Sequence, residues 1–91
     1  MYDEAQRKQI TRDHLAWAQT QFEVGNAVLA GAIADHSQFN GMGLFSLGSP
    51  ERVRAVMAVD PAITSGVDTY QLAQFVTRSG AIKRLRDSAA R

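Results

Sequence analysis

The sequence contains no cysteine and only two prolines among its 91 residues. Without cysteine the chain has no disulfide bond, no thiolate metal ligand and no cysteine nucleophile. Ten basic and nine acidic residues nearly cancel, so the chain lacks the basic excess that is typical of a dedicated nucleic-acid-binding domain. It also lacks an apolar run long enough to span a membrane, and residues 1–9 have no signal-peptide apolar region. The composition therefore predicts a cytoplasmic protein with neither a nucleic-acid nor a membrane partner.

The chain is long enough for one modest core. Its 91 residues, 45% of them hydrophobic, predict a single domain at residues 1–80 and a basic C-terminal tail at residues 81–91. We expect the charges of the tail to be solvated, because no aromatic residues alternate with them. A domain of this size is marginally stable by itself, so we expect a homodimer or a higher homo-oligomer that buries further apolar surface.

The longest amphipathic pattern, Arg7–Val24, predicts the first helix. At about 100° per residue, one broad face collects the apolar residues; these are Ile10, Leu15, Trp17, Ala18 and Phe22. His14 falls on the same face, and Arg7 lies about two turns earlier on that side. Two helix starts fit the pattern, a capping box at residues 3–6 and a later one at Thr11. A histidine on an inward face makes His14 the first candidate for a functional residue.

Alternating side chains predict three strands, at Ala27–Ala34, Gly43–Leu47 and Asp68–Thr77. Between the last two, Ser49-Pro50-Glu51 begins a short helix, which ends near Val59 because Pro61 disfavours helical conformation in the residue before it. Asp60 then caps a further turn that Gly66 closes. The order helix, strand, strand, helix, strand predicts an α+β sandwich whose helices cover one face of an antiparallel sheet.

Four short motifs follow one another at compatible spacings along this pattern. They are Arg7, then His14-Leu15-Ala16, then Gly25 with Val28-Leu29-Ala30-Gly31, and finally Val59-Asp60-Pro61 with Gly66-Val67. Between Arg7 and Val76 the chain thereby resembles the YCII-related family, small proteins of the ferredoxin-like, dimeric α+β barrel type. The resemblance implies a ferredoxin-like sandwich and a dimer.

Three departures from the family pattern stand out. Ala32 replaces a proline, Ala62 replaces an aromatic residue, and the first strand of the family is missing, because residues 1–9 are too polar to form it. In the family that strand lies between those corresponding to Gly43–Leu47 and Asp68–Thr77. Three arrangements of the sheet without this first strand stay open. The last strand closes up parallel to Gly43–Leu47 through a right-handed crossover, a partner chain or the tail fills the gap, or the sequence begins after the first strand of a longer protein.

The resemblance implies that His14 and Asp60 face one another in a pocket as an acid–base dyad. Histidine ionises near neutral pH, so it can take up a proton and return it, and a carboxylate at hydrogen-bonding distance orients the ring. Arg7 on the same side would bind an anionic or phenolate oxygen of a substrate. Without the resemblance, each residue has a sufficient structural explanation. His14 would be a core histidine bonded to a backbone carbonyl. Asp60 would be the N-cap of a helix.

The activity implied is a proton transfer without cofactor, either an isomerisation or an elimination such as dehydrochlorination, on a small cyclic or phenolic metabolite. The departures at Ala32 and Ala62 favour the alternative, a non-catalytic dimeric module that binds a small ligand or a partner. An inactive fragment is the third interpretation. We expect no metal site, because His14 and the loop pair Asp35-His36 supply only two imidazoles.

Overall fold

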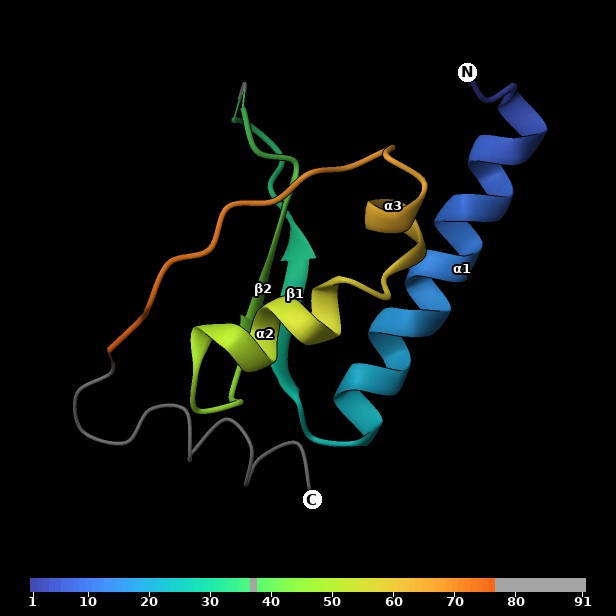
Figure 1. Cartoon of the computed structure of the whole chain (residues 1–91). Helices are drawn as coiled ribbons and strands as arrows, with labels where there is room; N and C mark the ends of the chain where they lie inside the picture. Colours follow the sequence, from blue (N-terminus) through green and yellow to red (C-terminus); the bar gives the residue numbers. More distant parts are fainter. Residues whose placement is uncertain (37, 77–91) are drawn as a thin grey trace.

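The computed structural model describes residues 1–36 and 38–76, which form a small α+β fold (Figure 1). In chain order its elements are α1 (Glu4–Glu23), β1 (Ala27–Ala32), β2 (Gly41–Phe45), α2 (Pro50–Met57) and α3 (Pro61–Thr64). The predicted basic tail at residues 81–91 lies outside the described residues. Within the described part, no helix is both long and apolar enough to cross a membrane.

Helix α1 begins at the earlier of its two predicted starts. The Asp3 carboxylate accepts from the Gln6 backbone N–H at 2.8 Å, and the Gln6 side-chain oxygen accepts from the Asp3 backbone N–H at 2.8 Å. This capping box satisfies two N–H groups that the first turn would otherwise leave unpaired. At the other end Gly25 takes a φ of 83°, a left-handed conformation that glycine adopts without steric cost. Local sequence signals therefore determine both ends of α1.

Asp3→Ala is expected to lower the free energy of unfolding by about 1 kcal/mol, because it removes the N-cap acceptor. Urea unfolding followed by far-ultraviolet circular dichroism measures the loss. Asp13→Ala is the matched control, since its carboxylate lies mid-helix on the surface and accepts only from the Gln9 side chain. Equal losses in the two variants would show that the cap contributes nothing of its own.

The strands β1 and β2 form an antiparallel hairpin, as predicted, although β2 begins two residues earlier than the predicted Gly43. Ala32 pairs with Gly41 and Ala30 with Gly43, and the register shifts between Ala27 and Leu29. Helix α1 packs against both β1 and α3. The Tyr2 hydroxyl adds a bond to the Ser65 carbonyl at 2.8 Å, which ties the start of α1 to the end of α3.

The predicted start signals of α2 and α3 are confirmed. The Ser49 hydroxyl accepts from the Arg52 backbone N–H at 3.3 Å, and the Asp60 carboxylate accepts from that of Ala62 at 3.0 Å. Proline follows each cap at the first helical position, where its missing N–H costs nothing. Gly66, with a φ of 79°, closes the turn after α3 as predicted.

The prediction of a last strand at Asp68–Thr77 is wrong for its described part. Residues 68–76 form neither strand nor helix, and they run from α3 as an extended trace across the hairpin (Figure 1). The Asp68 N–H bonds to the Ala62 carbonyl at 2.9 Å, and no ladder bond follows it within the described segment. Alternating side chains create two faces, but a strand also needs a neighbour with free backbone groups. The described sheet therefore has two strands, and the fold is established as α+β only.

The predicted apolar face of α1 is wrong in its breadth. Ile10, Trp17 and Ala18 are partly buried, whereas Leu15 is 59% exposed and Phe22 is 37% exposed. The last two lie roughly 120–140° around the helix from Ile10, at the margin of the predicted face. A two-stranded sheet and the short α3 are too small to cover so wide a face. Among the described residues the buried apolar side chains are two alanines, Ala27 and Ala62.

Candidate functional site

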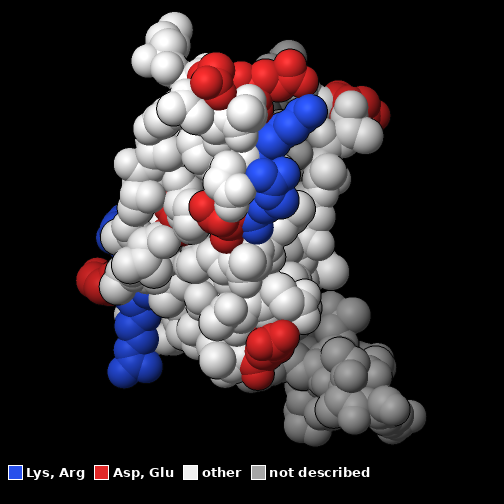
Figure 2. Space-filling view, turned by 90° about the vertical axis from the view of Figure 1, so that its right-hand side faces the viewer, with Lys and Arg blue, Asp and Glu red and all other residues white. Residues whose placement is uncertain are grey.

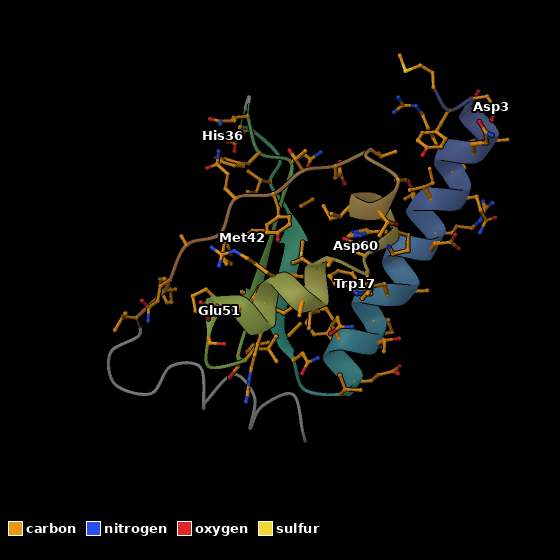
Figure 3. The ribbon with its side chains drawn as sticks, viewed as in Figure 1. Asp3, Trp17, His36, Met42, Glu51 and Asp60 are labelled. Carbon is orange, nitrogen blue, oxygen red and sulfur yellow. The ribbon has the colours of Figure 1, made fainter. Side chains whose placement is uncertain are left out.

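His14 and Asp60, 46 residues apart in the chain, meet where α1 packs on α3. The His14 Nδ1 atom lies 2.8 Å from Asp60 Oδ1 and 3.0 Å from Oδ2. In Figure 3 Asp60 and Trp17 are labelled at this junction, beside the middle of α1. The structure thus brings together the two residues that the family resemblance implied as a pair.

Asp60 is held from several directions. Its side chain is only 2% exposed, and Oδ1 accepts from the Ala62 backbone N–H at 3.0 Å as well as facing the imidazole. Its own backbone N–H donates to the Met57 carbonyl at 3.1 Å, which fixes the residue between α2 and α3. A buried carboxylate without partners would be costly, so the His14 ring and the Ala62 N–H together make this burial tolerable.

The His14 ring presents one nitrogen to Asp60 and leaves the other free of protein partners among the described residues. Because an ionised carboxylate only accepts hydrogen bonds, we assign a proton to Nδ1. In the neutral ring Nε2 then carries the lone pair. The side chain is 34% exposed. The pair therefore combines a buried, fixed carboxylate with a partly accessible nitrogen base.

Trp17 forms a wall of the site. Its ring stacks on the His14 imidazole with centroids 5.8 Å apart and planes at 28°, and it also touches the Phe45 ring at 6.4 Å. Its Nε1 atom is buried and has no hydrogen-bond partner among the described residues. The sequence pattern places Trp17 and His14 on the same face of α1, and their spacing of three residues makes the two side chains neighbours on the helix, but it did not specify that the rings stack.

Arg7 does not join the pair. It is exposed, and the described side-chain hydrogen bonds of His14 and Asp60 are the ones between the two residues and the one from the Ala62 N–H. Figure 2 shows charges of both signs on this side of the molecule. On α1, Lys8 and Glu4 form an ion pair of 3.3 Å. Substrate binding by Arg7 stays a prediction.

The second histidine, His36, is a local cap of the hairpin loop. Its Nδ1 atom accepts from the backbone N–H groups of Gln38 and Phe39 at 3.0 and 3.1 Å, and its ring lies 5.3 Å from that of Phe39. Across the residues that the structure describes, no three His, Asp or Glu side chains are grouped as metal ligands would be. His36 therefore provides a histidine control for experiments on His14.

Nitrogen-15 NMR of the imidazole rings is expected to show His14 as the Nδ1–H tautomer when it is neutral, because Asp60 accepts from Nδ1. His36 is expected as the opposite tautomer, since its Nδ1 accepts two backbone N–H groups. Asp60→Asn should mix the tautomers of His14 and leave His36 unchanged. A His14 spectrum that does not respond to Asp60→Asn would contradict the pairing.

The fold and the site define a small α+β protein with a half-buried histidine held by a buried aspartate between two helices. No protein-family model, no curated protein and no solved structure matches the chain. The resemblance to the YCII-related family accordingly rests on the sequence motifs alone, and any function has to be argued from the site itself.

Proposed function

We propose that this protein is a small cofactor-independent enzyme that uses His14 and Asp60 as an acid–base pair for proton transfer. The observation that carries the proposal is the geometry of the imidazole: Nδ1 is 2.8 Å from a buried carboxylate, while Nε2 has no protein partner among the described residues. A histidine oriented in this way is a suitable general base near neutral pH.

In the proposed reaction Nε2 of His14 takes a proton from an activated C–H of the substrate. The Asp60 carboxylate stabilises the imidazolium that forms, as a buried carboxylate does for a catalytic histidine elsewhere. In an isomerisation the electron pair of the broken C–H bond forms a new double bond, the pair of an adjacent double bond moves to the next carbon, and that carbon takes the proton back from His14. In an elimination the same pair forms a double bond while a leaving group such as chloride departs with its bonding electrons.

The family resemblance suggests a small cyclic or phenolic metabolite as the substrate. Trp17 beside His14 supplies an aromatic surface that suits a flat ring. Arg7 lies two helical turns from His14, roughly 10 Å along the axis. We propose that it binds an anionic or phenolate oxygen at the far end of the substrate. The ferredoxin-like order and a homodimer belong to the same proposal.

Deuterium exchange tests the proposal whatever product the reaction forms. Small phenols, lactones and cyclic ketones are incubated with the protein in D₂O, and proton NMR follows the loss of acidic C–H signals. We expect exchange with the wild type and with His36→Ala, whose histidine is a loop cap. His14→Ala should lose it, because Nε2 is the proposed proton acceptor. Equal exchange in all three proteins would refute a role for His14.

One observation favours the alternative, a non-catalytic dimeric module that binds a small ligand or a partner. An open apolar hollow lies on the hairpin rather than at the histidine, and its lining contains neither member of the pair. It is lined by Leu29, Ala30, Gly31, Ala32, Ile33 and Met42. Chemical-shift changes confined to the hollow, in the same compound screen and without deuterium exchange, would favour this function.

A further inference from the structure

Residues 69–76 have the features of a strand that lacks a neighbour. Polar and apolar side chains alternate from Thr69 to Leu72, the backbone follows an extended path (Figure 1), and no backbone hydrogen bond joins the segment to the other described residues. Large apolar side chains along this segment stay exposed, up to 68% for Phe75 and 77% for Val76. An extended apolar segment in water is unstable by itself, since both its side chains and its backbone would gain from pairing.

The outer edge of β2 carries backbone groups to which no described strand is paired. The Ile33 N–H donates to the Asn40 carbonyl at 3.0 Å and the Ser46 N–H to the Asn26 carbonyl at 2.8 Å, so even-numbered positions of this strand face β1. In an antiparallel pair the odd positions then direct their backbone groups outward; these are Gly41, Gly43 and Phe45. In the described sheet, order β1-β2, no strand pairs with that edge. Two of these three positions are glycines, and the Phe45 ring lies against Gly43.

We propose that residues 69–76 of one chain add as a strand to the outer edge of β2 in a second copy of this chain, and that the exchange is reciprocal. Among the described residues each copy holds one extended segment and one strand edge without backbone partners, so a two-fold arrangement pairs both in both copies. No other partner is needed. The exchange does not depend on the acid–base chemistry of His14.

The area available is sufficient for such a dimer. Six large side chains on the segment and the hairpin are exposed in the single chain: Leu29, Met42, Tyr70, Leu72, Phe75 and Val76. Burying them in both copies removes on the order of 1,200 Å² from water, which reaches the lower end of specific protein interfaces. The backbone bonds of two added strands come in addition.

Disulfide trapping tests the exchange directly, because the chain has no cysteine of its own. Met42→Cys is mixed with single variants carrying cysteine at positions 71, 72, 73 or 74, and the mixtures are oxidised. Cross-links between these chains can only be intermolecular. We expect a covalent heterodimer at every second position of the segment, because successive side chains of a strand point to opposite faces.

Two results would overturn the proposal. One is the absence of cross-links at all four positions. The other is a double variant, Met42→Cys with Leu72→Cys, that closes a disulfide within one chain while the mixtures stay unlinked, since the segment then pairs with its own hairpin.

Light scattering after gel filtration gives an independent readout. The wild type is expected to be a dimer. Val76→Lys is expected to raise the dissociation constant of that dimer at least tenfold. Val24→Lys is the matched control, because Val24 is comparably exposed but lies at the end of α1. A monomeric wild type, or equal effects of the two lysines, refutes the exchange. A dimer without deuterium exchange would support the strand exchange and count against the proposed function. A monomer that catalyses deuterium exchange would support the proposed function and refute the strand exchange.

Discussion

Asp60→Ala is expected to lower the free energy of unfolding by about 2–4 kcal/mol. The carboxylate performs two tasks at once: it caps α3 through the Ala62 N–H and it bonds to His14. Removing it leaves a buried N–H without a partner, and it releases the contact that joins α1 to α3. Urea unfolding followed by circular dichroism, with the slope against denaturant held common, measures the effect.

Asp60→Asn separates the two tasks. Asparagine is as good an N-cap as aspartate, so this variant should recover most of the lost stability while the charge beside His14 is gone. Asp35→Ala is a control, because Asp35 is exposed in the hairpin loop. If Asp60→Ala proved no more destabilising than Asp35→Ala, the packing of α1 on α3 through this residue would be refuted.

His14→Gln and Asp60→Asn are each expected to lower kcat/KM by about 10²- to 10⁴-fold on a substrate found by deuterium exchange. Glutamine keeps polar atoms near Asp60 but offers no nitrogen base. Asparagine keeps the cap but cannot stabilise an imidazolium by charge. Initial rates at saturating and limiting substrate measure the two constants separately.

The two losses should not add. If the residues act as one unit, the double variant loses little more activity than either single variant, because the second change removes a group whose partner is already gone. Multiplicative losses would mean that the two residues act independently. A His14→Gln enzyme with unchanged kcat would exclude this histidine as the base.

Much of the local structure follows from residues near one another in the chain. The capping box at Asp3 begins α1, Ser49 and Asp60 begin the next two helices, and glycines with positive φ follow α1 and α3. These signals are reliable because each rests on a hydrogen bond or a φ preference within a few residues. They also placed Asp60 at an element boundary as a helix N-cap, whereas its pairing with His14 was implied by the family resemblance.

Packing between distant segments was harder to predict. Leu15 belongs to the same apolar pattern as Ile10, yet neighbouring elements cover only the part of the helix nearest Ile10. The periodicity of a helix shows which side chains share a face, but it does not show how large a surface will pack against that face. The stack of Trp17 on His14 went unpredicted for the same reason. The motif resemblance suggested His14 beside Asp60, but their distance of 2.8 Å depends on how α1 lies on α3.

The sequence by itself determined the caps that begin α2 and α3, the glycines that close α1 and α3, and the α+β class, since each cap and turn depends on residues near one another in the chain. It left two starts open for α1, and it indicated the hairpin through the pattern of two strands whose paired residues, such as Ala27 and Phe45, lie far apart in the chain. Only the tertiary structure decided that Asp60 is buried against His14 and that residues 68–76 form no strand in the single chain. Both outcomes depend on what lies opposite a side chain or a backbone group. An alternating pattern creates two faces, but the presence of a neighbouring strand is a property of the assembled fold.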